Sequence, residues 1–239
     1  MGTRPPGRRE TATSVAHLHF EIWRGGDGRA AIDPMPFLRG WPVLERAIEA
    51  PRASEAPDPR AAIYLDQIFA RHGRGLPVAY LRALARAESG LNAFDPKGVI
   101  NVVKVALDEY NRLNPGVMVE SGRLRDPAVS VSVAAWILHR IIASYRAHHA
   151  DVVNLREDWN NPRFVELLSA GWNAGFSERA GVGRVVDYLK AHRQEISIDN
   201  VWRFARQAGA ADTLSNPHKL RFARRVAEDF ARMAAGGGA

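Results

Sequence analysis

The strongest constraint on the fold is a helical periodicity that runs from residue 60 to residue 234. Apolar residues recur there at spacings of three and four, which is typical of helices that bury one face. Pro77, Pro127, Pro162 and Pro217 stand at or near the predicted helix starts, where a missing N–H costs least. The expected helices lie near residues 60–72, 77–89, 100–112, 127–148, 161–174, 178–192, 199–208 and 217–234. The sequence therefore predicts a mainly α-helical domain.

Segment 127–148 is the most apolar of these and is predicted to be the central helix of the domain. No run in the chain approaches the roughly 18 apolar residues needed to cross a bilayer. The first eleven residues do not lead into the apolar stretch of a signal peptide. We therefore expect a soluble chain with no membrane span and no export signal of its own.

The chain before this domain has a different character. Residues 15–23 alternate in polarity and a glycine-rich cluster follows at 25–28, a pattern that predicts strand and turn. Residues 51–59 contain three prolines and are typical of a linker. The predicted organisation is a short β-hairpin region over residues 1–40, a Pro-rich linker over 41–59, the helical domain over 60–234 and a flexible tail over 235–239.

The chain of 239 residues carries 33 Lys and Arg against 26 Asp and Glu, a net charge of +7. Arginine supplies 29 of the 33 cations, and no run of five or six basic residues occurs. Charge alone therefore favours an anionic polymer such as a bacterial cell wall at least as well as nucleic acid, and no nucleic-acid partner is expected. The lack of cysteine excludes disulfides, thiolate zinc sites and cysteine nucleophiles.

The most specific local feature is a glutamate at the end of the second predicted helix. Leu81, Leu84, Ala85 and Glu88 follow an i, i+3, i+4, i+7 spacing and share the apolar face, and Gly90 follows as a helix stop. A carboxylate on the core side of a helix loses solvent, which raises its pKa and suits it to general acid catalysis. Alternatively, the side chain tilts out to solvent or pairs with a nearby arginine.

Two motifs are similar to those of the soluble lytic transglycosylases, lysozyme-like enzymes that cleave peptidoglycan glycan strands. Leu76-Pro77, followed by Tyr80-Leu-Arg-Ala-Leu-Ala-Arg-Ala-Glu-Ser-Gly-Leu-Asn92, resembles the first motif of that family. Ala170-Gly-Trp-Asn-Ala-Gly175 resembles its Ala-Tyr-Asn-Ala-Gly motif, and residues 219–226 resemble its closing helix. The resemblance implies a lysozyme-like helical fold between about residues 63 and 230, preceded by a β-hairpin remnant.

The resemblance also implies a mechanism without cofactor or metal. Glu88 would protonate the glycosidic oxygen between N-acetylmuramic acid and N-acetylglucosamine, and the substrate's acetamido oxygen would stabilise the developing cation. Glu88 would then act as a base on the 6-hydroxyl and close a 1,6-anhydro ring. Ser89, Trp172 and Asn173 would contact Glu88 or the sugars. Their alternatives are a helix-end serine, a core tryptophan and a helix-terminal asparagine.

The chain departs from this family at two places. Where the family carries Gly-Leu-Met-Gln after its glutamate, we align residues 101–104, Asn-Val-Val-Lys, which sets Lys104 in the place of the glutamine. Lys104 would then lower the pKa of Glu88, bind a lactyl or stem-peptide carboxylate, or extend to solvent. Phe222 stands where the closing helix has a tyrosine, and Tyr188 is a loose substitute. The alternative function is a non-catalytic peptidoglycan-binding or structural module.

A second, shorter resemblance lies near the N-terminus. His17-Leu-His19-Phe-Glu-Ile-Trp23 is similar to the end of lysostaphin-type zinc endopeptidases, in which His19 would be a zinc ligand. Three protein ligands are the norm for catalytic zinc, and the 16 residues before His17 contain neither His nor Asp. We therefore expect no zinc site here, and interpret residues 1–40 as the remnant of a peptidase domain. The implied location is the cell envelope, periplasmic or extracellular if exported, with the chain truncated at its N-terminus.

Overall fold

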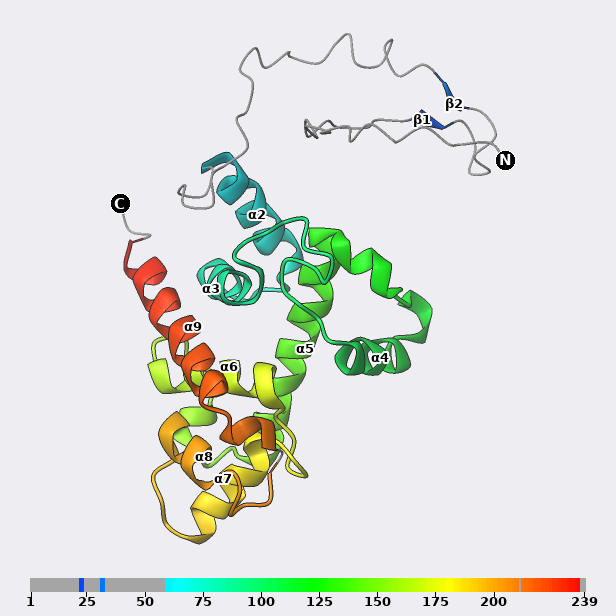
Figure 1. Cartoon of the computed structure of the whole chain (residues 1–239). Coiled ribbons are helices and arrows are strands. Elements are labelled where there is room, and N and C mark those ends of the chain that lie inside the picture. The colour runs from blue at the N-terminus through cyan, green and yellow to red at the C-terminus, as the bar shows by residue number, and fades with distance from the viewer. Residues whose placement is uncertain (1–21, 24–30, 33–58, 211, 237–239) are drawn as a thin grey trace, which may run out of the picture. The chain divides into compact units, whose positions relative to one another are not determined.

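The computed structural model describes residues 22–23, 31–32, 59–210 and 212–236 (Figure 1). The chain divides into two units, residues 1–55 and 56–239. In the first unit, strand β1 (Ile22–Trp23) pairs antiparallel with β2 (Ala31–Ile32), and Ile22 stands opposite Ile32. This pairing agrees with the hairpin expected there. The predicted zinc-endopeptidase residues His17 and His19 lie outside the described residues.

The second unit is built from helices, as the periodicity predicted. The α-helices are α2 (Pro59–His72), α3 (Val78–Ser89), α4 (Lys104–Leu113), α5 (Pro127–His148), α6 (Pro162–Ala174), α7 (Val182–Ala191), α8 (Ile198–Phe204) and α9 (Pro217–Gly236). Short 3-10 turns connect them at Pro115–Val117, Ser121–Arg125, Val153–Leu155 and Asp212–Ser215. The mainly helical fold class is therefore confirmed.

Helix boundaries depart from the prediction where short loops precede a helix. Helix α4 begins at Lys104 instead of near residue 100, because Val103 is extended. The preceding residues Val99, Ile100 and Val102 are buried, but they belong to a loop and not to the helix. Helix α7 begins after Gly181, which is also extended. In both places apolar residues anchor loop backbone to the core, and sequence periodicity does not distinguish that burial from burial by a helix.

Helix α5 is the most extensively buried helix, with buried residues along its whole length. It packs against α2, α4 and α6 (Figure 1), in agreement with the central position expected for it. By length and composition alone, α5 is also the one described helix apolar enough to cross a membrane. In this fold 56% of its most apolar window is buried against other helices, and core helices of soluble proteins pass the same test.

Helix α9 packs along both α3 and α6, and Figure 1 shows it running beside them from near the C-terminus. An aromatic cluster fills this junction. The Tyr80 ring lies 5.0 Å from the Trp159 ring and 6.1 Å from the Phe230 ring, and Trp159 lies 5.3 Å from Phe164. Edge-to-face pairs of this kind add directional packing to apolar burial. The cluster fixes α3 against α6 and α9, which carry the other side chains of the candidate site.

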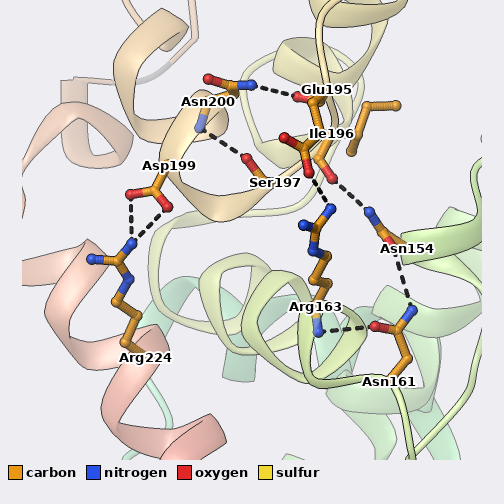
Figure 2. Close-up of polar contacts among 9 residues, drawn as sticks. All are labelled: Asn154, Asn161, Arg163, Glu195, Ile196, Ser197, Asp199, Asn200 and Arg224. Atoms are coloured by element: carbon orange, nitrogen blue, oxygen red, sulfur yellow. Dashed lines mark hydrogen bonds and ion pairs between the residues drawn. The ribbon is translucent and has the colours of Figure 1, made fainter.

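Polar contacts tie the base of α9 to its neighbours (Figure 2). Both carboxylate oxygens of Asp199 in α8 accept hydrogen bonds of 2.6 Å from Arg224 in α9. The Asn154 amide donates to the carbonyl of Ile196 at 2.7 Å, and Arg163 in α6 pairs with Glu195. Exposed ion pairs contribute little each, but together these bonds connect α6, α8 and α9. Helix α9 is therefore tied to α8, and the segment before α8 is tied to α6.

Candidate functional site

The candidate site centres on Glu88, in the last turn of α3. Helix α3 ends because Gly90 adopts a left-handed conformation with φ of 68°, which glycine reaches without steric cost. The N–H of Leu91 donates to the carbonyl of Ala85, and the N–H of Gly90 donates to that of Arg86. This is a Schellman-type helix end, which satisfies carbonyls that a helix otherwise leaves free.

Side chains from elsewhere in the chain satisfy the remaining carbonyls of this helix end. Arg225 of α9 donates to the carbonyl of Ala87 at 3.1 Å, and the Asn101 amide donates to that of Glu88 at 3.0 Å. The Ser89 hydroxyl lies 2.8 Å from the carbonyl of Val99 and so ties α3 to the following loop. The backbone that carries the Glu88 carboxyl is therefore fixed from three directions.

The Glu88 side chain lines a cleft of about 530 Å³. The cleft is lined by the loop after α3, by α4 and α5, and by the facing ends of α6 and α9. Its lining residues are Glu88, Lys97, Asn101, Val102, Val103, Lys104, Ala106, Ile137, Trp172, Asn173 and Lys219. Among these described residues Glu88 is the one acid, and three lysines share the cleft with it. A single carboxyl group in a cationic cleft is the main chemical feature of the site.

The carboxyl of Glu88 accepts a hydrogen bond of 2.8 Å at Oε1 from the indole Nε1 of Trp172 in α6. Burial raises the pKa of Glu88 above its ordinary value of 4.5, and this effect exceeds all others. The Trp172 hydrogen bond, the positive charge of Lys219 and the amides of Asn101 and Asn173 all lower the pKa in part. Glu88 is therefore a carboxyl group shifted toward its protonated form and surrounded by hydrogen-bond donors.

Two amide oxygens beside Glu88 are buried without a hydrogen-bond partner among the described residues. They are the Oδ1 atoms of Asn101 and Asn173. The amide of Asn101 is oriented by its bond to the Glu88 carbonyl, so its oxygen is directed away from that contact. A buried acceptor without a donor costs about 1–3 kcal/mol. Both oxygens are buried, so a ligand in the cleft reaches them only if the side-chain amides rotate.

The structure brings together four of the five predicted site residues: Glu88, Lys104, Trp172 and Asn173 all line the cleft. Ser89 does not line it, and its hydroxyl is directed at main-chain carbonyls. Lys104 lies at the rim with 85% of its side chain exposed, and it pairs with Asp108 one turn further along α4. The cation that acts on the Glu88 carboxyl is Lys219, and not Lys104.

Neither Phe222, which stands where the family has a tyrosine, nor Tyr188, the suggested substitute, lines the Glu88 cleft. Phe222 lines a separate groove on α9, and Tyr188 stacks on His192 with 4.0 Å between ring centroids. The tyrosine coupled to Glu88 is Tyr80, two turns earlier in α3, whose hydroxyl pairs with Ser169 at 3.3 Å. Burial raises the pKa of Tyr80, which keeps that hydroxyl neutral.

Sequence reasoning missed Asn101 and Lys219 as site residues. The signal for Asn101 is present in the sequence, because Gly98-Val99-Ile100-Asn101 matches Gly-Leu-Met-Gln better than residues 101–104 do. In that alignment Gly98 matches the glycine of the motif, and the side-chain amide of Asn101 matches that of the glutamine. Gly98 has φ of 93°, and a Cβ there would lie 2.5 Å from the Ser130 hydroxyl. The glycine is thus required by the turn that delivers Asn101.

Among the described residues no group of three metal-ligating side chains lies close enough together to hold a metal ion. Comparisons were made with family models, with curated proteins and with solved structures. No family model, curated protein or solved structure matches the chain. The interpretation of the cleft therefore depends on its own geometry and chemistry.

Proposed function

We propose that this chain is a peptidoglycan lytic transglycosylase with a lysozyme-like helical domain, acting at the cell envelope with Glu88 as its acid and base. The observation that carries the proposal is the carboxyl of Glu88, which lines a cleft, accepts a hydrogen bond from Trp172 and has its pKa raised by burial. A carboxyl group that keeps its proton can donate it to a glycosidic oxygen. The side-chain amides of Asn101 and Asn173, two residues that line the cleft, can hydrogen-bond to the hydroxyl and acetamido groups of amino sugars.

The reaction needs one carboxyl group and no cofactor. Glu88 donates its proton to the bridging oxygen as the bond to the anomeric carbon of N-acetylmuramic acid breaks, and the substrate's acetamido oxygen stabilises the cation. The ionised Glu88 then takes the proton of the 6-hydroxyl, and that oxygen bonds to the anomeric carbon. The product is a 1,6-anhydro sugar, and Glu88 recovers its proton without consuming water.

Trp172 and Lys219 serve the second half of this cycle. Both stabilise the ionised carboxylate, by a hydrogen bond at 2.8 Å and by charge. The burial of Glu88 favours the protonated form at the start of the cycle, and these two neighbours limit the cost of the ionised form in the middle. A carboxyl that must act first as an acid and then as a base requires both influences.

The test is the chemical identity of the product released from purified cell-wall sacculi. We expect mass spectrometry to find 1,6-anhydromuramyl ends after incubation with the wild-type chain and not with Glu88→Gln. Reducing ends in their place would mean hydrolysis by an activated water. The absence of both products would reject the enzyme proposal.

The second candidate function is a glycan-binding module without catalysis. The observation that favours it is the set of donors around Glu88, since Trp172 and Lys219 lower the pKa of the acid that must be protonated. This function predicts that wild type and Glu88→Gln both sediment with sacculi and that neither releases soluble fragments.

A further inference from the structure

A second groove lies along the first turns of α9, separate from the Glu88 cleft. It has a volume of about 620 Å³ and is lined by His218, Arg221, Phe222, Arg224, Arg225 and Glu228. These side chains occupy one side of the helix from residue 218 to residue 228, a rise of about 15 Å. Four of the six carry or can carry positive charge, and Phe222 provides an apolar surface between them.

Most of the positive charge in this groove is not neutralised by carboxylates. Arg224 is paired with Asp199, but no ion pair of the described residues involves Arg221 or Arg225. Arg221 contacts the Nδ1 of His218 at 2.9 Å, and Arg225 contacts a main-chain carbonyl. The one acid of the groove, Glu228, lies seven residues from Arg221, about 10.5 Å along the helix axis.

Two hydrogen bonds of α9 connect this helix to the surroundings of Glu88. Arg225 donates to the carbonyl of Ala87, the residue before Glu88. His218 in the groove is followed in sequence by Lys219 in the cleft, and the Lys219 ammonium donates to the carbonyl of Asn173 at 3.1 Å. The Arg225 guanidinium therefore lies next to the backbone of the helix end that carries Glu88.

We propose that the α9 groove binds the carboxylates of peptides attached to the glycan strand, so that the chain prefers peptide-bearing strands to bare ones. This inference rests on the proposed function, which places muramic acid in the cleft. The lactyl group of each muramic acid extends sideways from the sugar and carries a peptide with free carboxylates. Guanidinium groups bind carboxylates through charge-assisted hydrogen bonds, which the exposed Arg221 side chain is free to make.

The experiment measures binding apart from cleavage by using the full chain with Glu88→Gln. Cosedimentation is compared on intact sacculi and on sacculi whose stem peptides an amidase has removed. We expect about tenfold weaker binding to the bare strands, the scale of one charge-assisted hydrogen bond. Adding Arg221→Glu should weaken binding to intact sacculi by about tenfold and leave binding to bare strands unchanged.

The matched control is Arg71→Glu, which reverses the same charge on an exposed arginine of α2 outside both pockets. It should leave both affinities unchanged, and thermal unfolding should show that each variant is folded. Equal losses on both polymers, or no loss with Arg221→Glu, would overturn the inference. So would tight binding to duplex DNA that Arg221→Glu abolishes, which would assign the groove to nucleic acid.

The product assay on the wild type separates this inference from the proposed function. If the wild type releases 1,6-anhydro products and the Arg221→Glu binding result is negative, only the groove assignment fails. If the wild type neither cleaves intact sacculi nor binds bare strands, the proposed function fails and takes the groove assignment with it.

Discussion

The surroundings of Glu88 and those of His149 can be compared directly, because burial shifts the pKa of each side chain in the direction that favours its neutral form. Burial raises the pKa of Glu88 above 4.5 and lowers that of His149 below 6.5. Glu88 accepts a hydrogen bond from Trp172 and faces a cleft. Both ring nitrogens of His149 lack a hydrogen-bond partner among the described residues, and the nearest charge is Asp187 at 3.7 Å.

The difference teaches that a displaced pKa is not by itself a sign of chemistry. His149 closes the end of α5, and its ring packs beside Gly183 of α7, where a Cβ would lie 3.1 Å from Nε2. Among the described residues, no group lies within hydrogen-bond distance of either ring nitrogen of His149. Glu88 has hydrogen-bond donors for its ionised form. We infer that the surrounding groups, and not burial, distinguish a reactive side chain from a packed one.

The largest expected effect is on activity. Glu88→Gln should reduce release of 1,6-anhydro products from sacculi by about 100-fold to 10,000-fold, because the amide cannot transfer a proton. His149→Gln, which alters the other buried group, should leave the rate within about twofold of wild type, an amount close to measurement error. The rates are measured by soluble muropeptide release. A comparable loss in both variants would break the distinction between the two regions.

The same two variants should change stability in opposite pH ranges. The folded wild type binds the Glu88 proton more tightly than the unfolded chain, so its stability falls as pH rises above about 4.5 through the raised pKa. Glu88→Gln removes this loss and should raise Tm at pH 7 relative to the wild type. The gain should vanish near pH 3.5, where Glu88 is protonated in both the folded and the unfolded chain.

For His149 the sign is reversed. Its lowered pKa means that the unfolded chain binds a proton more readily, so the wild type loses stability as pH falls below about 6.5 through the folded-state pKa. His149→Gln should flatten the Tm profile over this range. Thermal unfolding followed by circular dichroism between pH 3.5 and 8 measures both effects. An acid slope that survives the substitution would assign it to other groups.

The smallest expected effect comes from Trp172→Phe. The ring remains but the indole N–H that donates to Glu88 is lost, so the pKa of Glu88 should rise further. The alkaline limb of kcat/KM should therefore move to higher pH. Trp202→Phe is the matched control, because that indole donates to the carbonyl of Ser215 and does not line the cleft. A limb that moves toward lower pH would contradict the role given to Trp172.

The sequence predicted the helices well and the cleft in part. Prolines at the first turns of α5, α6 and α9 and Gly90 after α3 are local signals, and the structure places these helix ends within one or two residues of the prediction. Glu88 could be singled out from the sequence because the i, i+3, i+4, i+7 spacing places it on the apolar face of α3. Its proximity to Trp172, 84 residues away, was inferred from motif resemblance and is present in the structure.

The missed residues depend on tertiary geometry. Lys219 lines the cleft because α9 packs against α3 and α6. No local sequence pattern in α9 predicts that packing. Lys104 has the charge expected of a partner for Glu88, but α4 begins at that residue and directs it to Asp108 and solvent. Asn101 was passed over because the motif alignment placed Lys104, and not Asn101, at the last position of the motif.

The most direct test is a ¹³C NMR titration of the Glu88 side-chain carboxyl, identified as the resonance that disappears in Glu88→Gln. The protonation state of this one group determines whether the cleft holds an acid that can donate a proton to a glycosidic oxygen. We predict a midpoint above 4.5, the ordinary value for glutamate. A midpoint at or below that value would show that the donors outweigh burial, and would contradict the role of Glu88 as a general acid.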